Sequence, residues 1–225
     1  MTVFEHIPHV ERKIFKRTFM NEISLLFTYS PLKMSEICEE IERISISMGM
    51  SVVTKGDTLL ILKDKDALVT WTANAVLVSI PSSEYKDFET TGFVWDHLSV
   101  ILKSIDVNPI VWSFTKGNRM VFAKAIDEEK KDEIFKIVLS DDLIENGGDK
   151  HFYVEESKDK TCVLTCRYGL EKYNGKDSLS LKTMITSQAY AIDGLKEQVF
   201  GVNELMYDSW YWCMSEDMFS LMDKK

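Results

Sequence analysis

The sequence predicts an α+β fold made of two similar β-α-meander-α units, whose antiparallel sheets are covered by helices on one face. Hydrophobic residues make up 45% of the 225-residue chain, enough to bury a core without a metal or disulfide. Short β-type runs alternate with turn sequences and with amphipathic stretches. A helical stretch around Trp95-Asp96-His97 is echoed 112 residues later by Tyr207-Asp208-Ser209. We therefore expect units at residues 1–107 and 108–225, packed as one compact, pseudo-duplicated domain.

The first unit is expected to begin with a strand and a helix. Apolar and polar residues partly alternate from Phe15 to Tyr29, which is typical of a strand. Ser30 and Pro31 suit the N-cap and the first position of a helix. Apolar residues then recur every three or four positions from Met34 to Met48, and Gly49 is suited to end the helix.

A meander and a second helix complete the first unit. Three β-type runs, Met50–Thr54, Thr58–Lys63 and Ala67–Ile80, are separated by two turn sequences, Lys55-Gly56-Asp57 and Asp64-Lys65-Asp66. Helical spacing then resumes from Thr91 to Ile105, after Pro81 and a polar connection.

The second unit starts after Asn108-Pro109 and repeats this order. Lys116-Gly117-Asn118 predicts a hairpin between Ile110–Phe114 and Arg119–Ala125. Asp127 is suited to cap a helix that carries Ile134, Ile137 and Val138.

The rest of the second unit is expected to be a meander and a helix. Its strands are predicted at His151–Glu155, Thr161–Tyr168 and Ser178–Tyr190, with Asn174-Gly175 as a turn. A helical region over Val202–Met222 closes the chain, with a break expected at Ser215 because serine favours the N-cap position.

Several features resemble a sporadically distributed family of uncharacterised prokaryotic hypothetical proteins. They are the Trp95-x-x-Leu98 helix before a central strand, the C-terminal stretch from Leu205 to Met222, and the start His6-Ile7-Pro8-His9. The family's Arg-Tyr-x-Asn signature is not matched, since Gly117-Asn118-Arg119-Met120 stands at its place. The resemblance covers most of the chain and implies duplicated α+β units of unknown function, so it assigns no role to any residue.

Composition and charge predict a cytoplasmic protein that does not bind membranes. The formal net charge is −9, which disfavours nucleic acid and anionic lipid as partners. The four cysteines lie in apolar contexts, and the first residues lack the features of a secretory signal. No apolar stretch reaches the length of about 20 residues that a membrane-spanning helix needs.

No motif identifies a catalytic, cofactor-binding or metal-binding residue, so we expect none of these sites and no cofactor. Cys162 and Cys166 share one strand face but stand about 13 Å apart at 3.3 Å per residue, too far for a zinc site without other ligands. A small hydrolase-like enzyme with a site at the junction of the halves remains an alternative. It would pair Cys162, Cys166 or Cys213 with His97 or His151.

The leading hypothesis is a non-enzymatic binding protein with a protein partner or a second copy of itself. Its candidate interaction surface is an aromatic set: Trp95, Tyr207, Trp210, Tyr211 and Trp212. The same residues could instead form a wide core contact between helix and sheet. A weaker alternative is nucleic-acid binding by an open sheet face, which requires the basic residues of segment 12–17 to join four others: Lys103, Lys116, Arg119 and Lys124.

Overall fold

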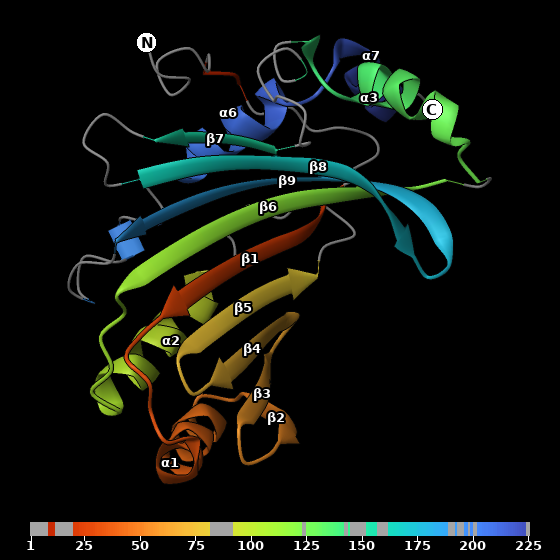
Figure 1. Ribbon diagram of the computed structural model, residues 1–225. Helices are drawn as coiled ribbons and strands as arrows, with labels where there is room; N and C mark the ends of the chain where they lie inside the picture. Colours follow the sequence, from red (N-terminus) through yellow and green to blue (C-terminus); the bar gives the residue numbers. More distant parts are fainter. Residues whose placement is uncertain are drawn as a thin grey trace.

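A computed structural model shows helices packed against one twisted antiparallel sheet (Figure 1). It describes residues 9–11, 20–81, 92–122, 125–141, 144, 152–156, 162–188, 192, 196–197, 199 and 202–223, and every structural statement below concerns these residues. The expected mixture of helices and antiparallel strands is confirmed.

The sheet has nine strands, drawn from both halves of the chain, in the order β2-β3-β4-β5-β1-β6-β9-β8-β7. Their bounds are β1 Met20–Thr28, β2 Ser51–Lys55, β3 Leu59–Asp64, β4 Ala67–Thr72, β5 Ala75–Pro81, β6 Val111–Val121, β7 Phe152–Glu156, β8 Cys162–Tyr173 and β9 Lys176–Gln188. The antiparallel pair β1–β6 lies at the centre and joins the two halves into one continuous sheet.

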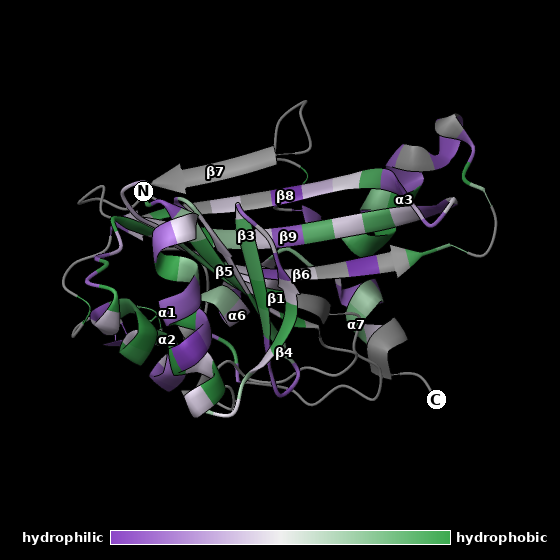
Figure 2. Cartoon of the chain, turned by 90° about the horizontal axis from the view of Figure 1, so that it is seen from below, coloured by the Kyte–Doolittle hydropathy of each residue, from purple (hydrophilic) through white to green (hydrophobic). Residues whose placement is uncertain are grey.

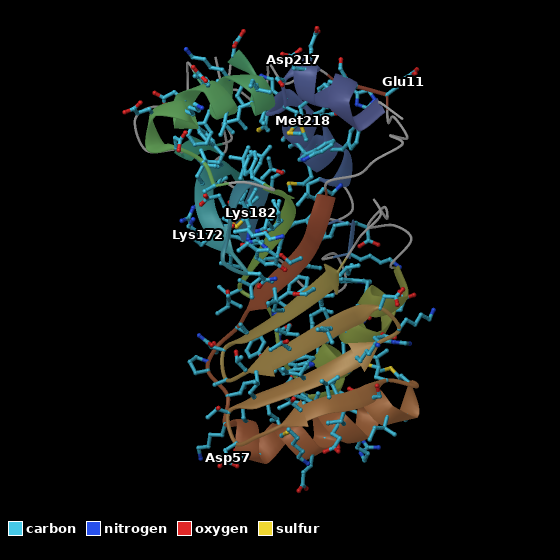
Figure 3. The ribbon with its side chains drawn as sticks, turned by 90° about the vertical axis from the view of Figure 1, so that its right-hand side faces the viewer. Glu11, Asp57, Lys172, Lys182, Asp217 and Met218 are labelled. Atoms are coloured by element: carbon cyan, nitrogen blue, oxygen red, sulfur yellow. The ribbon has the colours of Figure 1, made fainter. Side chains whose placement is uncertain are left out.

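The helices are α1 Met34–Ser47, α2 Gly92–Ser104, α3 Lys131–Val138, α6 Asn203–Trp212 and α7 Glu216–Asp223, with a 3₁₀ turn η3 at Glu128–Lys130. In Figure 1, α1 and α2 lie behind the strands of the first half, and α6 lies behind those of the second half. Figure 3 shows Asp217 on the outer side of α7 and Met218 on its inner side, in agreement with the complete burial of Met218.

One face of the sheet forms the core because buried side chains are paired with buried side chains across the strands. Leu62, Val69, Val78, Leu25, Phe114 and Ile185 follow one another in register from β3 to β9. Each is at most 2% exposed. Trp95 of α2 contacts this layer through the ring of Phe27, with a centroid distance of 5.6 Å. Figure 2 shows the matching contrast in hydropathy, with apolar strands inside and polar residues on the outer side of α1.

The predicted hairpin around Lys116-Gly117-Asn118 is wrong, because β6 runs without a break from Val111 to Val121. Gly117 lies opposite Glu22 of β1 and opposite Lys182 of β9. Pairing on both sides keeps the backbone extended through a sequence that would otherwise favour a turn.

The predicted single run Ala67–Ile80 is wrong as well, since it forms two strands, β4 and β5, joined at Ala73-Asn74. The carbonyls of this turn accept backbone N–H bonds from Leu32 at 2.6 Å and Tyr29 at 3.0 Å. Those bonds hold the segment after β1 against the turn. The helix that was expected to start at Ser30-Pro31 therefore starts at Met34, with Lys33 as its N-cap.

The helix predicted after Asp127 also starts later than expected. A 3₁₀ turn comes first, in which the Lys130 N–H donates to the Asp127 carbonyl at 2.9 Å, and α3 then begins at Lys131. The Asp127 side chain does not cap α3, whose N-cap residue is Lys130.

Three local predictions are confirmed. Asn174 and Gly175 both have positive φ, 50° and 76°, as a two-residue hairpin turn with asparagine and glycine requires. Gly49 has a φ of 87° directly after the C-cap of α1. The Ser215 hydroxyl accepts the N–H of Met218 at 3.1 Å, so this serine separates α6 from α7 as an N-cap. The predicted loop over 145–149 and the basic segment 12–17 lie outside the described residues.

Candidate functional site

The aromatic set that was predicted as an interaction surface is largely a core element. Trp95 is 4% exposed, and Tyr207 and Trp210 are each 2% exposed, so these three side chains cannot contact a partner. Tyr211 and Trp212 are half-buried. The physical reason is that α6 places its aromatic face on the sheet while α7 covers its end. The rings of Tyr211 and Phe219 stack there, with centroids 4.0 Å apart.

The Cys/His arrangement considered from the sequence is not found among the described side chains. Cys38 and Cys213 are buried free thiols, and burial raises the pKa of Cys38. His151 and the side chains of Cys162 and Cys166 lie outside the described residues. Within the part of the chain that the structure describes, no three His, Cys, Asp or Glu side chains are grouped to hold a metal ion.

His97 is paired with a carboxylate that the sequence pattern did not single out. Its Nδ1 lies 2.5 Å from Oδ2 of Asp64, which sits at the end of β3. The Asp64 side chain is 4% exposed and that of His97 is 26% exposed, so a buried acid orients a partly accessible imidazole. Asp64 continues the buried alternation of Leu60 and Leu62. The sequence could have shown this pairing, because alternation along β3 places Asp64 on the apolar face, and a buried carboxylate there requires a partner.

A second buried carboxylate, Asp208 of α6, holds the segment 9–11. Oδ1 of Asp208 accepts the backbone N–H of Val10, and Oδ2 lies near Nδ1 of His9, both at 3.2 Å. Asp208 is 7% exposed, whereas Asp96, its counterpart in the sequence echo, is exposed and pairs with Lys196 at 3.0 Å. The echoed aspartates therefore have different roles, and Asp208 is an attachment point within the fold.

The arrangement required for nucleic-acid binding is not formed by the described residues. Lys116 is completely buried on the core face, where its Nζ lies 5.5 Å from the centre of the Phe114 ring. Arg119 lies on the opposite face of the same strand, and Lys103 lies on α2. The side chain of Lys124 and the basic residues of segment 12–17 lie outside the described residues. Lys103, Lys116 and Arg119 thus cannot share one phosphate-binding surface.

The sheet face opposite the core is the most extensive candidate surface, and we call it the uncovered face. The helix contacts described above lie on the core side, as in the Trp95–Phe27 ring contact, and Figure 1 shows α1, α2 and α6 behind the sheet. Two rows cross the uncovered face in register. The first consists of Ile61, Thr70, Leu77, Leu26, Ser113, Thr186 and Val163, and the second of Leu68, Ser79, Ser24, Thr115, Met184 and Thr165.

Hydroxyl and apolar side chains alternate on the uncovered face. Twelve of the thirteen side chains in these two rows are half-buried, and Leu68 is 37% exposed. Ser113 and Thr186 join neighbouring strands through a hydroxyl hydrogen bond of 2.8 Å. The face thus offers hydrogen-bond donors and acceptors beside apolar contact area, the mixture that protein interfaces use.

Comparison with the models of known protein families and with curated proteins finds no match. The resemblance to prokaryotic hypothetical proteins stays a hypothesis, and the site has to be argued from its own geometry. No helix among the described residues has the length and apolar character needed to cross a membrane.

Proposed function

We propose that this chain is a non-enzymatic, cytoplasmic binding protein that contacts a protein partner, or a second copy of itself, through the uncovered face. The observation that supports this proposal is the apolar content of that face, where Leu26, Leu77 and Met184 lie among hydroxyl side chains. A sheet face that is only solvated is expected to be polar. The free thiols of Cys38 and Cys213 agree with a reducing compartment.

We also infer that the chain consists of two similar units. Outward from the central β1–β6 pair, the neighbours are β5 and β9, then β4 and β8, and then β3 and β7, so the strand order is symmetric about this pair except for β2, which has no counterpart among the described strands. Buried positions of α2 also recur in α6 and in the two residues that follow it. Trp95, Leu98, Ile101 and Leu102 are each followed 112 residues later by a buried residue, namely Tyr207, Trp210, Cys213 and Met214. This repeat of buried positions supports the duplication more strongly than the few shared identities do.

Photo-crosslinking in cells tests the binding proposal. Benzoylphenylalanine is placed at Leu68 or at Thr165 on the uncovered face, and at Val100 of α2, which is 47% exposed, as a control. We expect defined protein adducts from the first two positions and none from the control, with the adduct mass separating a second copy from another protein. An uncovered face that gives no adduct, or the same adducts as Val100, would contradict the proposal.

The pairing of His97 with Asp64 favours one second candidate, an enzyme that uses His97 as a base. An imidazole oriented by a buried carboxylate is one part of many hydrolytic sites. The pair lies on α2 and β3, within the first half of the chain, and not at the junction of the halves. Hydrolysis of p-nitrophenyl acetate by wild type and by His97→Gln tests this candidate. Equal rates from the two proteins would remove it.

A further inference from the structure

The apolar side chains of the uncovered face form a band that crosses the strands from β3 to β8. In the first row, β3, β5, β1 and β8 contribute apolar side chains, whereas β4 and β9 contribute threonines. The second row supplies Leu68 on β4 and Met184 on β9, each two residues from the threonine of its strand. We call these six residues the apolar band: Ile61, Leu68, Leu77, Leu26, Met184 and Val163.

The apolar band is long across the strands and narrow along them. Neighbouring strands lie about 4.8 Å apart, so the six steps from β3 to β8 cover about 29 Å. Along β1 and β5, in contrast, the Leu26–Leu77 pair is followed in the second row by Ser24 and Ser79. Figure 1 shows these strands side by side. A single element laid across the strands therefore covers more of the band than one laid along them.

The spacing of the apolar band fits one face of an α-helix. Residues three and four positions apart share a helix face, and at 1.5 Å per residue they recur about every 5.3 Å, close to the strand spacing. In an extended chain, side chains on one face recur about every 6.6 Å, so most of them would miss the strands. A helix of about 20 residues is 30 Å long and covers the whole band.

Exposed cations lie at the two ends of the apolar band. Lys63 of β3 is directly opposite Leu68, and Arg167 follows Thr165 by two residues on the same face of β8. Both residues are exposed, and neither makes a hydrogen bond or an ion pair within the part of the chain that the structure describes. One cation at each end is complementary to a helix with acidic side chains near its ends. Charges at the rim of an interface act more on encounter and partner choice than on affinity.

A second copy of this chain has no described helix that could cover the apolar band. The longest of the described helices is α1, whose 14 residues span about 21 Å. Its apolar residues Met34, Ile41 and Ile44 are buried in the core of its own chain. The chemistry of the band therefore favours a helix from a different protein.

We propose that the apolar band binds an amphipathic helix of a different protein, about 20 residues long, with acidic side chains near both ends. This inference rests on the binding role proposed for the uncovered face and specifies the chemistry of the partner. The apolar side of the helix contacts the band, as in other complexes in which a helix lies on an apolar surface. Polar side chains beside it reach the hydroxyls of Ser24, Ser79 and Thr115 in the second row.

The separation of two crosslinks tests whether the bound segment is a helix. Benzoylphenylalanine at Leu68 on β4 and at Thr165 on β8 probes points that are five strand steps apart, or about 24 Å. A helix covers that distance with about 16 residues, and an extended chain covers it with about 7. Peptide mass spectrometry of the adducts formed in cells identifies the crosslinked partner residue for each position. We expect the two residues to lie about 16 positions apart in one segment.

Charge reversal at one end of the band tests whether a single helix reaches both ends. Lys63→Glu is combined with the crosslinker at Thr165, on the far side of the band, and Lys136→Glu on α3 is the control of equal charge change at an exposed position. We expect Lys63→Glu to lower the adduct yield at Thr165 by about threefold or more, and Lys136→Glu to leave it nearly unchanged. Urea unfolding checks that both variants are as stable as wild type.

Three outcomes would overturn the helix proposal. They are crosslinked residues that do not lie about 16 positions apart in one partner segment, adducts that contain a second copy of this chain, and equal adduct yields from the two charge variants. In each of these cases the uncovered face still binds a partner, so the proposed function survives. The absence of any adduct from wild type would instead remove the binding function itself.

Discussion

Tyr29 offers a quantitative test of how the first half is held together. Its side chain is 3% exposed, and its hydroxyl lies 2.8 Å from the Thr72 carbonyl and 3.0 Å from the Ala75 carbonyl, at the two ends of the β4–β5 turn. In Tyr29→Phe the Ala75 carbonyl keeps the Thr72 hydroxyl at 3.1 Å, whereas the Thr72 carbonyl loses its bond. One buried acceptor without its partner costs about 1–3 kcal/mol.

The pH dependence gives the sharper result, because burial raises the pKa of Tyr29. A raised pKa in the folded state contributes stability below the unfolded-state value of about 10, and this contribution is lost as the pH rises further. One pH unit above that value, wild type should lose about 1.4 kcal/mol through this group, while Tyr29→Phe loses nothing through it. The stability difference between the two proteins should therefore be about 1.4 kcal/mol smaller at pH 11 than at pH 7.

Urea unfolding followed by circular dichroism at pH 7 and at pH 11 measures this difference. Tyr173→Phe serves as a control for the removal of a tyrosine hydroxyl, since the Tyr173 side chain is 42% exposed. A difference between wild type and Tyr29→Phe that is the same at both pH values would refute the reasoning. It would mean that ionised Tyr29 is tolerated in the folded chain.

Three further predictions concern single side chains. His97→Ala should lower the free energy of unfolding by about 1–3 kcal/mol, because the Asp64 carboxylate, 4% exposed, loses its partner. His97→Gln should lower it less, and chemical unfolding measures both variants. Cys38 should resist maleimide at pH 8 in the native protein and react in urea, since burial raises the pKa of its thiol. Mass spectrometry measures the labelling, and rapid labelling of the native protein would contradict this prediction. Gly175→Ala should cost about 1–2 kcal/mol because φ is 76°, whereas Gly169→Ala should not destabilise the protein; equal urea midpoints would count against the turn argument.

Local chemistry determined which parts of the fold could be predicted. Asn174-Gly175 and Ser215 were identified because a hairpin turn and a helix cap depend on the residues present there. The break predicted at Gly117 failed for the opposite reason, since β6 is kept straight by β1 and β9, which are distant in sequence. The start of α1 failed likewise, because the Ala73 carbonyl holds Leu32.

The candidate sites were harder to predict than the elements. Asp64 was assigned to a turn, although its place after Leu60 and Leu62 puts it on the buried face next to His97. The aromatic residues of α6 were correctly placed on a helix, but their spacing alone could not distinguish a core contact from an exposed patch. Arg167 of β8 lies opposite Lys182 of β9 because the Asn174-Gly175 turn sets the register of these two strands. That register can be worked out only after both strands have been assigned.

The central β1–β6 pair also bears on the order in which the chain can fold. Leu25 pairs with Phe114, so the first strand of the sheet waits for a partner about 90 residues further along the chain. Contacts between such distant segments are slow to form, because the chain loses the entropy of loop closure before the contacts that offset this loss have formed. During synthesis, β1 and β5 can pair early, but the other edge of β1 stays open until β6 has left the ribosome. A chaperone that shields a strand edge would act most effectively in that interval.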